Sequence, residues 1–167
     1  LPIHMKSACS YRLKLNEGSF FSAGGGYPDF ETRTIELSAQ YSYVLATDIT
    51  DFYNQIYLHR LNNAIEYSNP ALKNKAKDIE SFLTKLNGKT SQGIPVGPAA
   101  SVVMSEALMT DIDQFLSGKN LPFTRYVDDI RIFSNCTEEL DYVLRELTTY
   151  LYENHRLTLA SGKTFIM

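Results

Sequence analysis

Residues 123–133, FTRYVDDIRIF, join two β-rich runs through a pair of acidic residues. Residues 123–127 and 130–133 predict the strands of a β-hairpin, with Asp128 and Asp129 between them. Aspartate tolerates the left-handed backbone of tight turns, so turn geometry alone is one explanation for this pair. The hairpin is therefore expected, and the role of its two acids depends on the rest of the chain.

Another acid, Asp48, follows an apolar run earlier in the chain. Residues 43–47, YVLAT, predict a buried strand that ends at Asp48. Thr50 or Asp51 then caps a helix expected to reach about Tyr67, because such side chains accept hydrogen bonds from the amides of a first helical turn. An aspartate at a junction of this kind is often only a helix cap.

Two more helices are expected before the hairpin. Asn69 caps the first, with proline at its first helical position, and Asn87-Gly88 ends it. A loop rich in glycine and proline, residues 93–97, precedes the second helix, which covers about 98–116.

After the hairpin, Thr137 is expected to cap a fourth helix, with Glu138 and Glu139 in its first turn, where the helix dipole favours acids. Two short strands follow at 156–159 and 164–166. This order of elements predicts an α+β fold with an antiparallel sheet and helices on one face.

The first forty residues differ from the rest and hold four of the nine glycines. The Gly24–Gly26 run followed by Tyr27-Pro28 is a turn signal, and residues 11–15 alternate like a strand. Residues 1–40 are therefore expected to form a loop-and-strand lobe attached to the main domain.

Composition sets the broad class. The 167 residues suit one domain, and 44 % apolar with 21 % charged residues exclude disorder. There is no apolar run long enough for a membrane helix and no signal peptide, and the start suggests a piece of a longer protein. Cys9 and Cys136 form no CxxC pair and fit a cytoplasmic location. A net charge of −3 gives no overall basic footprint for nucleic acid.

Asp48, Asp128 and Asp129 all follow or join apolar strands. Carboxylates that approach one another in a low-dielectric site raise each other's pKa unless a cation lies between them. Oxygen-only ligation by aspartate, completed by phosphates and water, is typical of Mg²⁺, and a pair of such ions suits phosphoryl or nucleotidyl transfer. Taken singly, each acid has a structural explanation as a cap or a turn residue.

Residues 91–101, SQGIPVGPAAS, predict a stiff loop at a helix N-terminus, where glycine allows close approach to the backbone. A tight start to the helix is the simpler interpretation. Together with the acids, however, the loop completes an ordered set of motifs. Residues 48–53, 92–98, 126–129 and 157–164 resemble four successive blocks of the reverse transcriptase palm, the third being the Tyr-x-Asp-Asp box.

The resemblance covers about residues 41–167 and implies a ferredoxin-like palm with a fingers insertion near 68–90. Residues 1–40 would then be a partial fingers lobe, and the thumb would be absent from this chain. The forms of the blocks are most similar to bacterial reverse transcriptases of the abortive-infection and phage-defence kind.

The resemblance also implies roles for single residues. Asp48, Asp128 and Asp129 would be catalytic and would bind two Mg²⁺ ions, for which Mn²⁺ could substitute. The backbone carbonyl of Ile49 would also face a metal. Lys163 matches a lysine proposed to protonate the pyrophosphate leaving group, although a solvated strand-end charge is an equal alternative.

A second set of residues would bind the nucleotide. Tyr53 matches the bulky residue that excludes a 2′-hydroxyl and selects deoxynucleotides, with Asp51 and Phe52 beside it. Gln92 and Gly93 would contact the incoming nucleotide and the templating pair.

The implied activity is addition of deoxynucleotides to a primer 3′ end on an RNA or DNA template, by two-metal catalysis. The partners would be dNTP, template, primer and the remaining polymerase domains, without a membrane. One alternative is a template-independent or protein-primed DNA polymerase of a phage-defence system. The other is a non-catalytic palm that binds nucleic acid or a protein partner.

Overall fold

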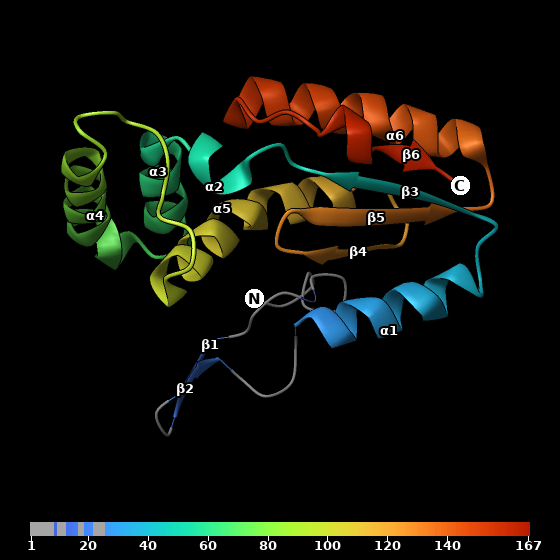
Figure 1. Cartoon of the computed structure of the whole chain (residues 1–167), viewed down its shortest axis with the longest axis horizontal. Helices are drawn as coiled ribbons and strands as arrows, with labels where there is room; N and C mark the ends of the chain where they lie inside the picture. The colour runs from blue at the N-terminus through green and yellow to red at the C-terminus, as the bar shows by residue number, and fades with distance from the viewer. Residues whose placement is uncertain (1–8, 10–12, 17–18, 22–25) are drawn as a thin grey trace.

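The computed structural model describes residues 9, 13–16, 19–21 and 26–167 (Figure 1). The expected strand at 11–15 lies partly outside these residues, and β1 is described over Leu13–Asn16. The strands are β1 (Leu13–Asn16), β2 (Ser19–Phe21), β3 (Tyr43–Asp48), β4 (Phe123–Tyr126), β5 (Asp129–Ser134) and β6 (Phe165–Ile166). The helices are α1 (Tyr27–Ser38), α2 (Phe52–Gln55), α3 (Leu58–Ser68), α4 (Lys73–Leu86), α5 (Ala99–Ser117) and α6 (Thr137–Tyr150), with shorter turns η2 (Pro70–Leu72), η3 (Leu151–His155) and η4 (Ser161–Lys163).

The main sheet has four strands in the order β4-β5-β3-β6, and all neighbours are antiparallel. β3 and β5 form its centre, in a register that runs from Tyr43 opposite Ser134 to Asp48 opposite Asp129. The α+β class and the antiparallel sheet expected from the sequence are therefore confirmed.

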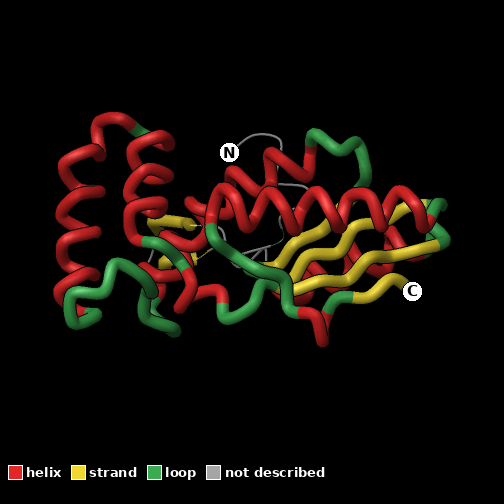
Figure 2. Tube along the Cα trace, turned by 90° about the horizontal axis from the view of Figure 1, so that it is seen from above, coloured by secondary structure: helices red, strands yellow, loops and turns green. Residues whose placement is uncertain are grey.

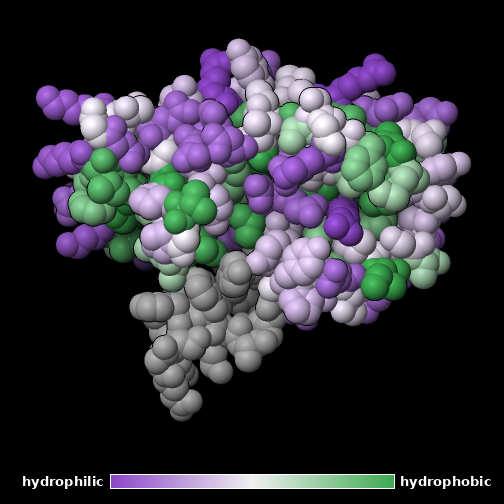
Figure 3. Space-filling model, viewed as in Figure 1, coloured by the Kyte–Doolittle hydropathy of each residue, from purple (hydrophilic) through white to green (hydrophobic). Residues whose placement is uncertain are grey.

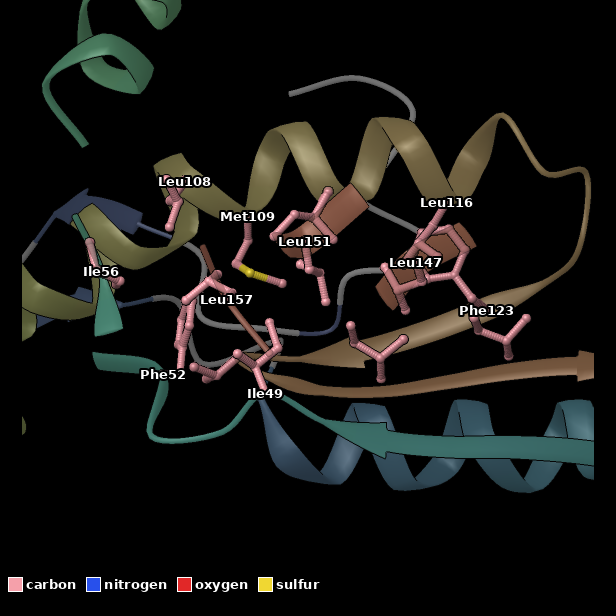
Figure 4. Packing of buried hydrophobic residues seen from close by; sticks show 14 of the residues in the cluster. Ile49, Phe52, Ile56, Leu108, Met109, Leu116, Phe123, Leu147, Leu151 and Leu157 are labelled. Carbon is pink, nitrogen blue, oxygen red and sulfur yellow. The ribbon is translucent and has the colours of Figure 1, made fainter. Parts of the chain in front are cut away.

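One face of this sheet packs against α5 and α6, which lie side by side along it (Figures 1 and 2). Leu45 pairs with Ile132, and Ile130 is two residues before Ile132 on β5, so all three share the face that enters the core. Met109 from α5 and Leu147 from α6 meet them there (Figure 4). Burial of these apolar side chains, at about 25 cal/mol per Å², is the main force that holds the helices on the sheet.

The second face of the sheet carries an element that the sequence did not reveal. Residues 27–38 form helix α1, so the expectation of loops and strands throughout 1–40 was wrong for this segment. Pro28 lies in the first turn, where its missing N–H is not needed, and the Gly26–Pro28 turn signal marks a helix start. Phe30 and Leu37 are buried side chains of α1, and this helix contacts β4 and β5, with the Phe30 ring against Tyr126.

The single helix expected from Thr50 to about Tyr67 was also wrong, because it is broken into α2 and α3. Ile56 and Tyr57 are extended, with ψ of 116° and 123°. Tyr57 pairs with Gln92, and the Ile56 carbonyl accepts a 2.9 Å hydrogen bond from the Gly93 N–H. Backbone groups that would close a helical turn therefore bond to the following loop instead.

Some helix boundaries agree with the expectation and others differ by a residue. The Asn69 side chain caps η2 by accepting from the Ala71 N–H at 3.0 Å, as expected. Asp51 occupies the N-cap position of α2 but makes no capping hydrogen bond through its side chain. Thr137 is the first residue of α6, so Cys136 takes the N-cap position in its place.

The two expected C-terminal strands have different outcomes. Residues 164–166 include β6, so this strand is confirmed in part. Residues 156–159 form no named strand, because Arg156 has φ +58° and only Leu159 makes an isolated bridge, to Ile49.

α3, η2 and α4 lie at the end of the molecule beyond the β3–α2 junction (Figures 1 and 2). Within this group, α3 packs against both α4 and α5. On the face shown in Figure 3, hydrophilic and hydrophobic residues are interspersed over the described part of the chain. Across the described part of the chain, no helix is both long enough and apolar enough to pass through a lipid bilayer.

Candidate active site

The three predicted catalytic aspartates meet at one end of the main sheet. Asp48 is the last residue of β3 and pairs in register with Asp129, the first residue of β5. Asp128 lies in the turn before Asp129, and its carbonyl accepts a 3.3 Å hydrogen bond from the Ile49 N–H. Residues 80 positions apart in the sequence are thus joined by backbone pairing at the end that faces α2 (Figure 1).

The hairpin turn is shifted by one residue from the expected one. Val127 and Asp128 form it, and Asp129 already belongs to β5. Val127 has φ +53°, an uncommon value for a β-branched residue. As a result, the two neighbouring acids have different backbone environments: Asp128 lies in the turn and Asp129 lies in a strand.

The site is electrostatically unfavourable for its own acids. Burial raises the pKa of Asp128 to about 6, and the nearby Asp48 carboxylate adds to the rise. Burial also raises the pKa of Asp129, again with a contribution from Asp48. A cation between them would relieve this repulsion.

Two basic side chains already offset part of the charge. Lys163 Nζ donates a 3.1 Å hydrogen bond to Asp48 Oδ2, and this bond raises the lysine pKa. The Ala160 N–H donates to the Asp48 carbonyl at 2.8 Å, which holds the segment before η4 beside β3. Arg131, two residues beyond Asp129 on β5, lies with its Nη2 3.7 Å from Asp129 Oδ2.

The donor set fits a hard divalent cation in chemistry but is not a closed chelate. All three acids offer carboxylate oxygens, the ligands that Mg²⁺ prefers, and the raised pKa of Asp128 gives a reason to bind one. Among the described residues, however, no three His, Cys, Asp or Glu side chains form a complete metal-holding group. A cation held by these acids would take its further ligands from substrate or water.

The predicted nucleotide-binding residues form a second group around α2. The Ile94 N–H donates to the Tyr53 carbonyl at 2.9 Å, and Gln92 Nε2 donates to Gln55 Oε1 at 2.7 Å. Gly93 has φ +93° and lies close to the Asn54 carbonyl. The loop therefore packs directly on α2, which begins four residues after Asp48.

The remaining predicted residues take different positions. Phe52 is 2 % exposed and belongs to the core (Figure 4). Its ring makes an edge contact with the Tyr53 ring, with the centroids 5.6 Å apart. The Ile49 side chain is fully buried. Asp51 is exposed in a left-handed conformation and its Oδ1 accepts from Asn54 Nδ2 at 2.7 Å.

Two arginines near the site were not given a role by the sequence analysis. The Arg131 guanidinium lies 4.6 Å from the centre of the Phe30 ring in addition to its contact with Asp129. Arg125, in β4, is buried and bonds to Glu106 and Asp113 on α5. The ion pairs of Arg125 had a signal in the sequence. Glu106 and Asp113 are seven residues apart and so share one side of a helix, and Arg125 is a charged residue in an otherwise β-rich run.

A comparison with protein families matches residues 6–167 to the reverse transcriptase (RNA-dependent DNA polymerase) family. Because the match covers nearly the whole sequence, the chain belongs to this family, and it contains the palm region that the four blocks predicted. No curated protein matches the sequence. The resemblance to bacterial defence enzymes in particular stays a prediction.

Solved telomerase structures share the fold. Apo telomerase from Candida tropicalis matches with a TM-score of 0.61 at 12 % identity over 85 % of this chain and 32 % of that one. Telomerase from Candida albicans, in complex with a TWJ fragment of telomeric RNA, gives 0.57 at 12 % identity over 83 % and 30 %. A C. tropicalis telomerase truncated from its C-terminal domain gives 0.56 at 14 % identity over 84 % and 34 %.

At identities of 12–14 %, these similarities establish the fold alone. The chain spans about a third of the length of each telomerase chain that it matches.

Proposed function

We propose that this chain is the catalytic palm of an enzyme that adds deoxynucleotides to a primer 3′ end on a nucleic-acid template. The observation that carries the proposal is the convergence of Asp48, Asp128 and Asp129 at one end of the sheet, with the pKa of Asp128 raised to about 6. A site that concentrates ionised acids at a cost is expected to bind cations during its work.

Asp48, Asp128 and Asp129 would hold Mg²⁺, and the Ile49 carbonyl is a further candidate ligand. Bound divalent ions supply charge neutralisation at the reacting phosphate. The protein's own part is to fix the carboxylates through the β3–β5 register and to place the nucleotide against α2. Lys163 is 66 % exposed on a flexible stem, so it can leave Asp48 and serve a departing phosphate as a proton donor.

Tyr53 is proposed to exclude the 2′-hydroxyl of a ribonucleotide. Its ring packs on buried Phe52, which would act as a support for Tyr53 and not as a direct contact to the sugar. Tyr53→Ala is expected to lower the preference for dNTP over rNTP by at least about tenfold, because a steric wall is removed. Ratios of kcat/KM for dTTP and UTP measure it, and Tyr67→Ala, an exposed tyrosine on α3, is the control. An unchanged ratio would remove this assignment.

The α3–η2–α4 unit is proposed to be the fingers insertion, since it stands apart from the sheet at the end where the acids lie (Figure 1). Residues 1–40 remain a proposed part of the fingers, with the qualification that α1 packs on the sheet.

The test is primer extension by the full-length gene product that carries this sequence. Poly(rA)/oligo(dT) and a primer without template are each incubated with dTTP, in Mg²⁺ and in EDTA, beside Asp128→Asn. Extension that needs template, Mg²⁺ and Asp128 supports the proposal. Extension without template would favour a terminal or protein-primed polymerase, and no extension by the unmodified protein would favour a non-catalytic binding module.

A further inference from the structure

Arg125 is a charged side chain held inside the protein beside the candidate active site. It lies in β4, and its side chain is 1 % exposed. Burial of a guanidinium is costly unless every N–H finds a partner. Among the described residues, a helix and the hairpin turn both supply such partners.

The helix contribution comes from α5. Arg125 Nε and Nη2 donate to the two carboxylate oxygens of Asp113 at 2.7 and 2.8 Å, a two-pronged contact. Nη1 and Nη2 also donate to the two oxygens of Glu106 at 3.1 and 2.9 Å. Glu106 and Asp113 are two helical turns apart, so both reach the same guanidinium from one side of α5.

The turn contribution is a hydrogen bond to the backbone just before Asp128. Arg125 Nη1 donates to the Val127 carbonyl at 2.8 Å. That carbonyl belongs to the same planar peptide unit as the Asp128 N–H, so fixing one fixes the other. Val127 has φ +53°, a conformation that a β-branched residue does not adopt readily without an external constraint.

The outer side of β4 is also held in place. The Cys9 N–H donates to the Arg125 carbonyl at 2.7 Å, and Cys9 Sγ lies 3.3 Å from Thr124 Oγ1. The backbone of Arg125 is therefore fixed at the sheet edge while its side chain reaches inward to α5. The N-terminus of α5 in turn follows the loop that carries Gln92 and Gly93.

We propose that Arg125 is a positioning residue for Asp128: it clamps the Val127–Asp128 peptide to Glu106 and Asp113 and so aims the Asp128 carboxylate at the cation site. This inference rests on the proposed function. A purely structural ion pair would need no bond to the turn, and apolar residues often replace such pairs without loss of stability.

The main test is Arg125→Lys in the full-length protein, since lysine keeps the charge but loses the planar fork. Mn²⁺ affinity is measured from the electron paramagnetic resonance signal of free Mn²⁺, and kcat and KM for dTTP from primer extension. We expect Mn²⁺ affinity and kcat each to fall about 10- to 100-fold, as for other residues that orient metal ligands. KM for dTTP should change less than about threefold, because the hydrogen bonds of the Arg125 side chain to α5 and to the Val127 carbonyl support Asp128 and not the α2 group.

The matched control is Glu146→Gln. It breaks the ion pair between Lys119 and Glu146, which joins the end of α5 to α6 away from the turn. This variant is expected to lower the thermal midpoint without a change in Mn²⁺ affinity. Circular dichroism of each variant establishes that it is folded.

Glu106→Gln is the second variant, for the case in which Arg125→Lys does not fold. It keeps the Asp113 contact, and a smaller loss of Mn²⁺ affinity, about threefold, is expected from it. Wild-type Mn²⁺ affinity and kcat in a folded Arg125→Lys, or unchanged affinity in Glu106→Gln if the lysine variant is unfolded, would overturn the inference and leave the proposed function intact. An unmodified protein that neither binds Mn²⁺ nor extends a primer would overturn both.

Discussion

At the residue scale, Asp128 combines two demands that conflict. As a proposed cation ligand it must ionise, yet burial and the neighbouring Asp48 raise its pKa from 3.8 to about 6. The folded protein therefore holds a carboxylate at neutral pH that the unfolded chain would ionise more easily. Catalytic sites commonly accept such a cost in stability for the sake of their chemistry.

Asp128→Asn is accordingly expected to stabilise the metal-free protein while it abolishes incorporation. The gain in free energy of unfolding is on the order of 1 kcal/mol, once solvent screening at this half-exposed group is allowed for. Urea unfolding in EDTA measures this gain. Asp78→Asn is the control, because the Asp78 side chain on α4 is exposed. A clear loss of stability would contradict the electrostatic account.

The same shift defines a pH window. Between the unfolded pKa of 3.8 and the folded pKa of about 6, the folded state retains a proton that the unfolded state has lost. The contribution of Asp128 to metal-free stability is therefore present below the unfolded pKa and is lost as pH rises through about 6.

Cation binding should follow the opposite trend, because a protonated carboxyl is a poor ligand. Mn²⁺ affinity is expected to increase from about pH 5 to about pH 7 and to level off above that. Titrations of Mn²⁺ at several pH values check this, with Asp128→Asn as a reference that lacks the titrating group. An affinity that is flat across the window would show that Asp128 does not bind the ion.

At the scale of elements, the loop after α4 separates helices α2 and α3. Its residues 91–93 form hydrogen bonds with the backbone of residues 56–58, which therefore does not continue the helix. Gly93 bonds to the Ile56 carbonyl with φ +93°, and a Cβ there would lie 3.4 Å from the Asn54 carbonyl oxygen. That distance is an ordinary van der Waals contact, so it is the positive φ that favours glycine at this position.

Gly93→Ala is expected to cost about 1–3 kcal/mol of unfolding free energy and to reduce incorporation at least about tenfold, since an alanine at φ +93° strains the backbone of the loop that packs on α2. Gly88→Ala is the matched control, because Gly88 also has positive φ, +61°, but open space around it. That variant should cost about 1 kcal/mol and leave kcat unchanged. Denaturation and primer extension are measured for both, and equal effects on kcat would remove the loop from the proposed site.

At the scale of the whole molecule, α1 connects the N-terminal region to the sheet. Phe30 is fully buried, with Tyr126 at 6.1 Å and the Arg131 guanidinium over its ring. The helix therefore covers the sheet face opposite α5 and α6, immediately beside the strands that carry the acids.

Phe30→Ala is expected to destabilise the protein by about 3–5 kcal/mol, the usual cost of removing a buried aromatic side chain. Ile35→Ala on the same helix should stay within about 0.5 kcal/mol, because Ile35 is 69 % exposed. Chemical denaturation of the two variants compares them. A small effect at Phe30 would mean that α1 unfolds independently of the sheet.

Much of the local structure was predictable because local residues determine it. The strand ending at Asp48, the cap at Asn69 and the acidic hairpin each depend on neighbours within a few positions. The break at Ile56–Tyr57 was not predictable in this way, since the competing hydrogen bonds come from residues 91–93. Helix α1 was not predicted because the glycine run and Pro28 at its start are typical of a turn, and because only Phe30, Thr34 and Leu37 are buried along it.

The amino-acid sequence by itself determined the α+β class, the family and the identity of the three acids, because each depends on residue types in order along the chain. The tertiary structure alone decided which charges offset those acids and what holds them. Lys163 reaches Asp48, and Arg125 joins α5 to the Val127 carbonyl, through contacts between residues distant in sequence or between different elements. Only folding brings such partners within hydrogen-bond distance, and burial then sets how strongly each charge acts on the next.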